Sequence, residues 1–189
     1  MTEVLGAAPI AALQPARCGA CARRQLHRRA AAIGLLIGML FGTIETPPRP
    51  RLLWNASASA PVGLYLVEVG VPFQRGDMVA AETPAVVRQL AADRGYLPIG
   101  VPLVKRIAAA HGSLVCARDA IITVDGHVAA ERLRSDGAAR PMPWWRGCFR
   151  LGWRDYLLLN PTPTSFDGRY FGPVNASALV GKAVPLWLR

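Results

Sequence analysis

Short apolar stretches separated by turn signals recur along the chain from residue 63 onwards, and this pattern restricts the fold more than any other feature. The clearest case is residues 121–128, where Asp125-Gly126 has the sequence of a type I′ turn between two strands. Further strands are expected at residues 63–69, 78–81, 101–110, 156–159 and 179–186. Many short strands joined by tight turns predict a mainly β, antiparallel domain.

One short helix is expected within this β-rich part, at residues 84–93. Thr83 is a suitable N-cap, and Pro84 suits the first helical position because its φ is already helical. Gly95 is suited to end the helix because it accepts the left-handed conformation. Residues 165–173 (SFDGRYFGP) are expected to form a loop.

A membrane-anchor helix is expected ahead of the β domain. Residues 30–44 (AAAIGLLIGMLFGTI) carry no charge, and they follow a basic cluster of Arg17, Arg23, Arg24, Arg28 and Arg29. A helix of this length spans only about 22 Å of an apolar bilayer core of about 30 Å, so snorkelling arginines and flanking residues must complete the span. The positive-inside rule places the N-terminus in the cytoplasm and the remainder outside.

Two other interpretations of the apolar run stay open. A cleaved signal peptide has the same basic start and short apolar core, although no A-x-A-like site follows Ile44. A buried helix of a soluble domain is the second. With a retained anchor, the chain divides into a basic cytoplasmic segment (1–29), an anchor or uncleaved signal (30–46), a linker (47–54) and the β domain (55–189).

The four cysteines fall into two groups, a C-x-x-C motif near the N-terminus and two separate cysteines in the β domain. Cys18 and Cys21 make a lone C-x-x-C, and a structural zinc site needs four ligands, which His27 alone does not complete. We expect this pair to be inert and predict no metal site. Cys116 and Cys148 lie in the part that faces outward, where disulfides persist, but their spacing leaves the pairing open.

A candidate nucleophile lies in residues 55–65 (NASASAPVGLY). Pro61 and Gly63 predict a tight turn that leads into a strand. Ser57 and Ser59 are two residues apart, so in an extended segment their side chains face the same cleft. One hydroxyl is then suited to attack and the other to donate a hydrogen bond beside it. A polar loop without a chemical role fits the same residues.

A candidate base is one of only two lysines among 22 basic side chains, Lys105 and Lys182. An amine can lose its proton when desolvated, whereas a guanidinium cannot. Lys105 lies in the apolar residues 101–110, on the opposite strand face from Arg106. Burial there lowers the pKa of an amine, which suits Lys105 to act as the general base for Ser59. A lysine that snorkels from a half-buried strand is the alternative.

A histidine base is less suitable. His27 lies in the predicted cytoplasmic segment, His127 lies at a hairpin turn, and His111 precedes Gly112 in another expected turn.

Three segments, in order, resemble the type I signal peptidase superfamily, and specifically its TraF-like conjugative-transfer peptidases. They are residues 55–65 (NASASAPVGLY), 102–108 (PLVKRIA) and 165–173 (SFDGRYFGP). The resemblance covers about residues 55–187, and the S-A-P-V-G-L-Y form of the first segment favours the TraF-like branch. It implies a signal-peptidase-like antiparallel β domain behind a membrane anchor. His111-Gly112 stands where the family often has Gly-Asp, so a different turn is expected there.

The resemblance also implies roles for individual residues. Ser59 is the nucleophile, Lys105 is the base, and Ser165 hydrogen-bonds the amine. The Ser57 hydroxyl and the Ser59 amide form the oxyanion hole. Asp167 matches an acidic position counted with the catalytic residues.

Arg169 is expected to pair with Asp167 and to make the loop rigid. A structural ion pair without a chemical role is the alternative for both side chains.

The implied protein is an inner-membrane serine endopeptidase whose catalytic domain faces the periplasm. It cleaves a secreted polypeptide, a pilin precursor for conjugative transfer, through an acyl-enzyme and without cofactor or metal. Small residues are expected at the substrate P1 and P3 positions. Whether water or an amine resolves the acyl-enzyme, giving hydrolysis or cyclisation, stays open.

Two alternative functions are considered. A general type I signal peptidase would use the same residues. A non-catalytic, basic, membrane-anchored component of a transfer apparatus would explain the net charge of +10 by binding DNA or anionic lipid. Since five arginines precede the apolar run, where topology accounts for them, we expect no specific nucleic-acid partner.

Overall fold

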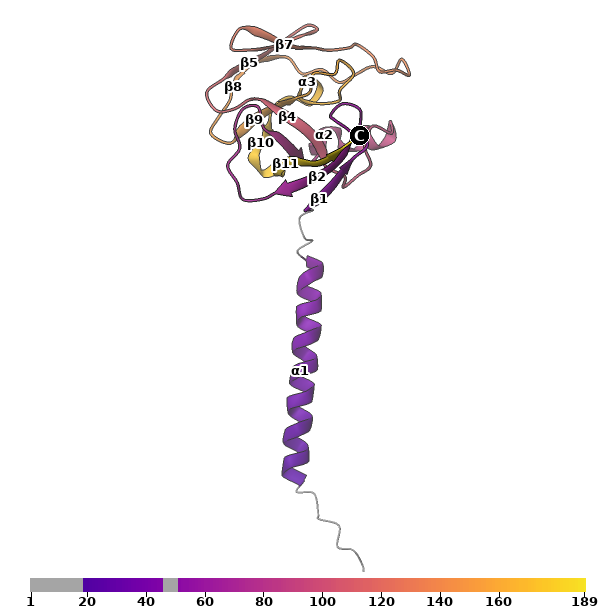
Figure 1. The fold of residues 1–189 in the computed structure, drawn as a ribbon, viewed down its shortest axis with the longest axis vertical. Coiled ribbons are helices and arrows are strands. Elements are labelled where there is room, and N and C mark those ends of the chain that lie inside the picture. Colours follow the sequence, from indigo (N-terminus) through magenta and orange to yellow (C-terminus); the bar gives the residue numbers. More distant parts are fainter. Residues whose placement is uncertain (1–18, 46–50) are drawn as a thin grey trace, which may run out of the picture. The chain divides into compact units, whose positions relative to one another are not determined.

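The computed structural model describes residues 19–45 and 51–189, and the fold in Figure 1 is reported for these residues. The chain forms two compact units, residues 1–48 and residues 49–189. Arg17, Cys18 and half of the predicted linker (47–50) lie outside the described residues, as does residue 46 of the predicted anchor.

The described residues of the first unit form the helix α1 (Gly19–Glu45), which is longer than the predicted anchor because it includes four of the five clustered arginines. Its sequence is rich in Ala, Leu and Arg and contains no Pro, which favours a continuous helix. Apolar side chains are exposed along residues 33–39 of this helix, namely those of Ile33, Leu35, Leu36, Ile37 and Met39. Across residues 19–45 and 51–189, no helix has both the length and the apolar character that a membrane crossing requires.

The second unit is built on a seven-stranded antiparallel sheet with the order β1-β2-β11-β3-β4-β9-β10. Its strands are β1 (Leu52–Asn55), β2 (Gly63–Glu68), β3 (Met78–Ala81), β4 (Leu103–Ala109), β9 (Asp155–Leu159), β10 (Val174–Asn175) and β11 (Leu179–Leu188). The expected mainly β, antiparallel architecture is confirmed. Strand β1 occupies part of the predicted linker, so the β domain begins before residue 55.

A second antiparallel sheet has the order β7-β6-β5-β8. Its strands are β5 (Leu114–Arg118), β6 (Ile121–Val124), β7 (His127–Glu131) and β8 (Gly147–Arg150). The predicted hairpin turn is present, because Asp125 and Gly126 both have positive φ, at 51° and 83°. Cys116 and Cys148 face each other on β5 and β8 and form a disulfide, which answers the question that spacing left open.

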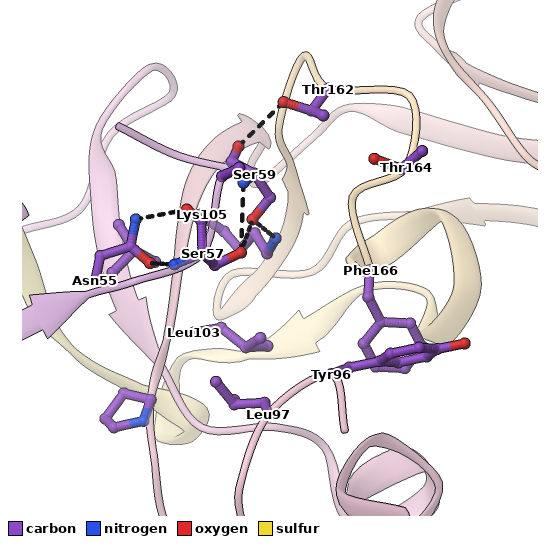
Figure 2. Close-up of a pocket in the computed structure, with 13 residues that line it drawn as sticks. Asn55, Ser57, Ser59, Tyr96, Leu97, Leu103, Lys105, Thr162, Thr164 and Phe166 are labelled. Carbon is purple, nitrogen blue, oxygen red and sulfur yellow. Dashed lines mark hydrogen bonds between the residues drawn. The ribbon is translucent and has the colours of Figure 1, made fainter. Parts of the chain in front are cut away.

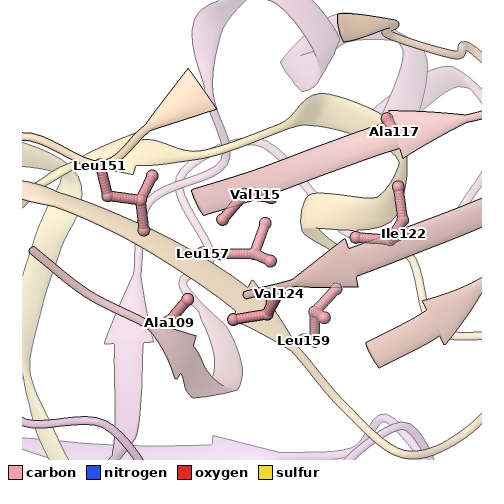
Figure 3. Packing of buried hydrophobic residues seen from close by; sticks show 8 residues of the cluster. All are labelled: Ala109, Val115, Ala117, Ile122, Val124, Leu151, Leu157 and Leu159. Atoms are coloured by element: carbon pink, nitrogen blue, oxygen red, sulfur yellow. The ribbon is translucent and has the colours of Figure 1, made fainter. Parts of the chain in front are cut away.

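A shared apolar core joins the two sheets (Figure 3). Side chains from β4 and β9 pack against side chains from β5 and β6, in a cluster made of Ala109, Val115, Ala117, Ile122, Val124, Leu151, Leu157 and Leu159. Each fully buried Leu, Ile or Val of this kind contributes about 1.5–3 kcal/mol relative to an exposed one. The cluster therefore fixes β4, which carries Lys105, and β9, which leads into the segment with Asn160 and Ser165.

Three short helical segments complete the unit: α2 (Ala85–Asp93), α3 (Gly168–Phe171) and the 3₁₀ helix η1 (Ala176–Ala178). In α2 the N-cap position is held by Pro84 and no side chain caps the helix, so Thr83 is not the N-cap that we expected. Gly95 follows the C-cap with a φ of +70°, as predicted for a helix end. The expectation of one helix was too low, because four residues are too few for α3 to show helical periodicity.

Candidate active site

The loop between β1 and β2 carries both candidate serines (Figure 2). Ser59 is half-buried at the mouth of a cleft of about 250 Å³, and Ser57 is exposed beside it. Their Oγ atoms are 2.9 Å apart. Sequence reasoning placed the two hydroxyls on one side of the segment, and the structure brings them into contact.

Asn55, the last residue of β1, holds this loop from inside. Its Nδ2 donates hydrogen bonds to the backbone oxygens of Ser57, Ala60 and Pro61, at 3.0, 3.2 and 3.0 Å. Its Oδ1 accepts one from the Ser57 amide at 3.1 Å. A single buried side chain thus ties both ends of the turn that presents Ser59.

Lys105 lies on β4, near the middle of the seven-stranded sheet, and only 2% of its surface is exposed. Its Nζ donates to Ser59 Oγ at 2.9 Å and to Ser165 Oγ at 2.8 Å. Arg106 points to the exposed face, as the strand alternation predicted. Ser59, Lys105 and Ser165 come together from three separate parts of the chain.

Burial lowers the pKa of the Lys105 amine to about 8, because a charged ammonium is poorly solvated there. The negative charge of Asp167 opposes this shift, and the positive charge of Arg169 adds to it. A substantial fraction of the amine is therefore neutral near pH 8 and able to accept a proton.

The Ser59 amide donates a hydrogen bond to Ser57 Oγ at 3.3 Å. The resemblance assigned these two groups as the donors of an oxyanion hole. In this structure the Ser59 amide donates to Ser57 Oγ. A bound carbonyl oxygen would therefore have to replace Ser57 Oγ as the acceptor of this amide.

Asp167 and Arg169 form a fully buried pair behind Ser165. Arg169 Nε donates to Asp167 Oδ1 at 2.8 Å, and Nη2 donates to Oδ2 at 3.2 Å. Asp167 also accepts from the backbone amides of Asn160 and Arg169, at 3.0 and 3.1 Å. Its carboxylate acts on Lys105 through its charge, since these hydrogen bonds do not involve the amine.

Gly168 lets this pair sit close to the sheet. A Cβ at that position would lie 2.7 Å from the backbone oxygen of Leu158, so only glycine allows α3 to pack on β9 at this distance. This close approach brings Asp167 and Arg169 against the end of β9, the strand that pairs with β4.

Sequence reasoning missed two buried asparagines, Asn55 and Asn160. Asn160 follows β9, and it bridges to β4 by donating to the Val104 carbonyl at 3.1 Å and accepting from the Arg106 amide at 3.1 Å. These bonds flank Lys105 in the chain. Asn55 ends a strand and Asn160 directly follows one, and both precede a turn, which is the one sequence signal that points to them.

The histidines of the described β domain lie outside the cleft. His111 and His127 are both exposed, and neither is among the residues that line the cleft. The hydrogen bonds of Ser59 Oγ in this structure are made with Lys105 and Ser57.

A serine hydroxyl beside a desolvated lysine amine, on an antiparallel β scaffold, is the arrangement of a candidate Ser–Lys hydrolase site. The chain belongs to the signal peptidase family, peptidase S26, whose family model matches residues 24–188.

Its relatives include plasmid and conjugal transfer proteins. A plasmid transfer protein TraF from Escherichia coli is 36% identical over 67% of this chain and 77% of its own. A probable conjugal transfer protein TraF from Sinorhizobium fredii is 33% identical over 82% of this chain and 90% of its own. The chain is therefore a signal-peptidase-like, TraF-type member of the family. A crystal structure of a signal peptidase I from Enterococcus faecalis aligns with a TM-score of 0.35 and 21% identity, over 59% of this chain and 97% of that one.

Proposed function

We propose that the protein is a serine endopeptidase that uses Ser59 as nucleophile and Lys105 as general base. One observation carries this proposal: a nearly fully buried amine, with its pKa lowered to about 8, lies 2.9 Å from the Ser59 hydroxyl oxygen. A serine hydroxyl needs such a base within hydrogen-bond distance to be activated at physiological pH.

In the acylation step, neutral Lys105 accepts the proton of the Ser59 hydroxyl as Oγ forms a bond to the substrate carbonyl carbon. The tetrahedral intermediate then collapses, the C–N bond breaks, and the Lys105 ammonium returns a proton to the leaving amine. An ester between Ser59 and the acyl part of the substrate remains. Water, or an amine, attacks this ester with Lys105 again as base and regenerates the Ser59 hydroxyl.

Ser165 directs the base. When the amine is neutral it has one lone pair, and its hydrogen bond to Ser165 Oγ at 2.8 Å favours rotamers in which that lone pair points to Ser59. Ser165 is itself buried, so water does not compete for this contact.

Ser57 and the Ser59 amide are assigned to the oxyanion. On substrate binding, the carbonyl oxygen replaces Ser57 Oγ as the acceptor of the Ser59 amide, and the Ser57 hydroxyl turns to donate to the same oxygen. Loss of one such donor costs about 10²–10³ in kcat.

Asp167 is assigned a supporting role. Both of its oxygens are engaged by Arg169 and by backbone amides, so the carboxylate shapes the loop and raises the pKa of Lys105 through space. The sequence-based assignment of Asp167 to the catalytic residues stays a prediction, and its contacts favour action through Lys105.

The substrate that we propose is a pilin precursor, because two relatives are named as transfer proteins of the TraF type. We assign the catalytic domain to the periplasm. We assign its attachment to the inner membrane to α1, which contains the uncharged residues 30–44. Replacing Ile37 and Met39 with Asp should release the protein from carbonate-washed membranes. Retention of that variant would count against attachment by α1.

The deciding experiment compares the wild type with the Ser59→Ala, Lys105→Arg and Ser57→Ala variants, each co-expressed with a pilin precursor. The host strain lacks other maturation peptidases, and product mass is read on intact peptide. We expect no processing with the first two variants and slower processing with Ser57→Ala. Unchanged processing by Ser59→Ala would refute the mechanism and favour a non-catalytic transfer component.

The same mass measurement separates the two fates of the acyl-enzyme. A product one water lighter than the linear peptide means that an amine resolved the ester and the peptide became cyclic. A linear product means hydrolysis.

A further inference from the structure

The end of the cleft away from the two serines is apolar. The apolar side chains that line the cleft are those of Tyr96, Leu97, Pro102, Leu103, Val104 and Phe166, and Lys105 is the one charged side chain among the lining residues in the described part of the chain. Figure 2 shows Leu103 and Leu97 beneath the serine loop, with the rings of Tyr96 and Phe166 beside them. This end is therefore suited to an apolar side chain of the substrate.

Tyr96 comes from the segment that joins α2 to β4, which also contributes Leu97 and Pro102 to the cleft. The Tyr96 ring packs on Phe166, with ring centroids 5.1 Å apart. Phe166 stands between Ser165, the partner of Lys105, and Asp167. The wall of the apolar end is thus continuous with the residues that hold the base.

Tyr96 is held from the side opposite the cleft by Asp136. The Tyr96 hydroxyl donates a hydrogen bond to Asp136 Oδ2, which also accepts from Arg140 Nε at 2.7 Å. Asp136 Oδ1 accepts from the amides of Ala138 and Arg140, both at 2.9 Å. With all these donors around it, the Asp136 carboxylate is itself fixed in place and 9% exposed.

Two further contacts brace the same wall. Arg94 Nη1 donates to the Pro141 carbonyl at 2.9 Å, and the Arg140 guanidinium lies over the Tyr96 ring, 5.7 Å from its centroid. Residues 134–142 thereby hold residues 94–97 in place.

We propose that Tyr96, locked by Asp136, is the specificity-determining residue of the apolar subsite and restricts it to short substrate side chains. The inference rests on the proposed function, since it concerns the substrate of that same site.

The restriction follows from rigidity. A longer side chain would have to push the Tyr96 ring away, which breaks its tilted ring contact with Phe166 and its hydrogen bond to an ionised carboxylate. A flexible wall would instead yield to the longer side chain at little cost. One methylene in an apolar pocket typically changes kcat/KM by 10–200-fold, so a rigid wall discriminates strongly.

The test uses two series of peptides that cover the four residues before the scissile bond, with Ala or Leu at each position in turn. The readout is the ratio of kcat/KM for Leu to that for Ala at each position. Tyr96→Ala should raise this ratio about tenfold or more at one position. Asp136→Ala should raise it less, and should have no further effect on the ratio in a Tyr96→Phe background, because the hydroxyl that Asp136 holds is then absent.

Tyr156→Ala is the matched control, because Tyr156 packs on Phe73 and does not line the cleft. A purely structural role for Tyr96 would lower kcat/KM for both peptides equally and leave the ratio unchanged, which would overturn the inference. So would an equal change in the ratio with Tyr156→Ala.

Failure of the inference is distinguishable from failure of the proposed function. Binding of the same Ala and Leu peptides to the Ser59→Ala protein, measured by calorimetry, does not require cleavage. An active Ser59→Ala protein would refute the proposed mechanism. The subsite would still be tested by the preference of the protein for the Ala peptide over the Leu peptide, and by the loss of that preference when Tyr96→Ala is added.

Discussion

Lys105 directs its Nζ at the Oγ of Ser59 across 2.9 Å while only 2% of the lysine surface is exposed. Burial and contact therefore coincide at one amine, and the pKa of that amine is lowered to about 8 mainly by loss of solvation. A group of this kind sets the pH range in which the serine can be activated.

The first prediction concerns the pH dependence of activity. In the proposed mechanism the neutral amine is the active base, so kcat/KM should rise with pH around a single midpoint near pH 8 and then level off. The measurement is kcat/KM for a cleavable peptide between pH 5.5 and pH 10. A midpoint near the ordinary lysine value of 10.5 would mean that the free enzyme does not desolvate this amine.

The second prediction concerns the charges behind the base. The Asp167 charge raises the pKa of Lys105 and the Arg169 charge lowers it. Asp167→Asn should therefore move the midpoint of the pH dependence of kcat/KM to lower pH, and Arg169→Met should move it to higher pH. Both variants should also lose stability by about 3–5 kcal/mol, because each leaves a buried partner unpaired.

The half-buried pair Lys182–Asp77, at 2.9 Å, supplies the control for these variants. Asp77→Asn breaks an ion pair of nearly the same length outside the cleft and should leave the midpoint of the pH dependence in place. If Asp77→Asn and Asp167→Asn shifted this midpoint equally, the buried charge of Asp167 would have no specific effect on Lys105.

The third prediction concerns Asn55. Asn55→Ala leaves the carbonyls of Ser57, Ala60 and Pro61 without their donor, so the loop should lose its fixed shape. We expect kcat to fall more than KM changes, together with a stability loss of about 1–3 kcal/mol. Kinetics and chemical denaturation of the same preparation measure both effects.

Asn175→Ala is a suitable comparison, since Asn175 is exposed and bonds to Asp155 away from the cleft. If Asn55→Ala lost stability but kept the wild-type kcat, the loop clamp would be structural only.

Much of the candidate site could be predicted because its information is local. Alternation along residues 101–110 put Lys105 opposite Arg106, and the spacing of Ser57 and Ser59 put two hydroxyls side by side. The Asp125-Gly126 turn is likewise a local signal, and all three expectations agree with the structure.

The rest of the site depends on contacts between distant parts of the chain. Asn160 meets Val104 across 56 residues, and Tyr96 meets Asp136 across 40, so no window of sequence contains either pair. The strands β1 and β8 are each four residues long and carry too few alternations to stand out. The Cys116–Cys148 pair needed the register of β5 and β8 before its geometry could be judged.

The last prediction concerns the cost of the buried lysine to the fold. Below about pH 8 Lys105 is protonated in the folded and the unfolded chain, so it adds no pH dependence to stability. Between about pH 8 and 10.5 the unfolded chain holds one proton more than the folded chain, so the free energy of unfolding rises with pH. The total rise is about 3 kcal/mol, from 1.36 kcal/mol for each pKa unit.

Lys105→Met removes this titration while keeping an apolar stem of similar length. The difference in the free energy of unfolding, wild type minus variant, should therefore be constant from pH 6 to about pH 7 and increase by about 3 kcal/mol by pH 10.5. Urea denaturation at each pH measures it, and titrations elsewhere in the chain cancel in the difference. A flat difference over the whole range would mean that the amine keeps its ordinary pKa in the folded protein, and the base assigned to Ser59 would lose its physical basis.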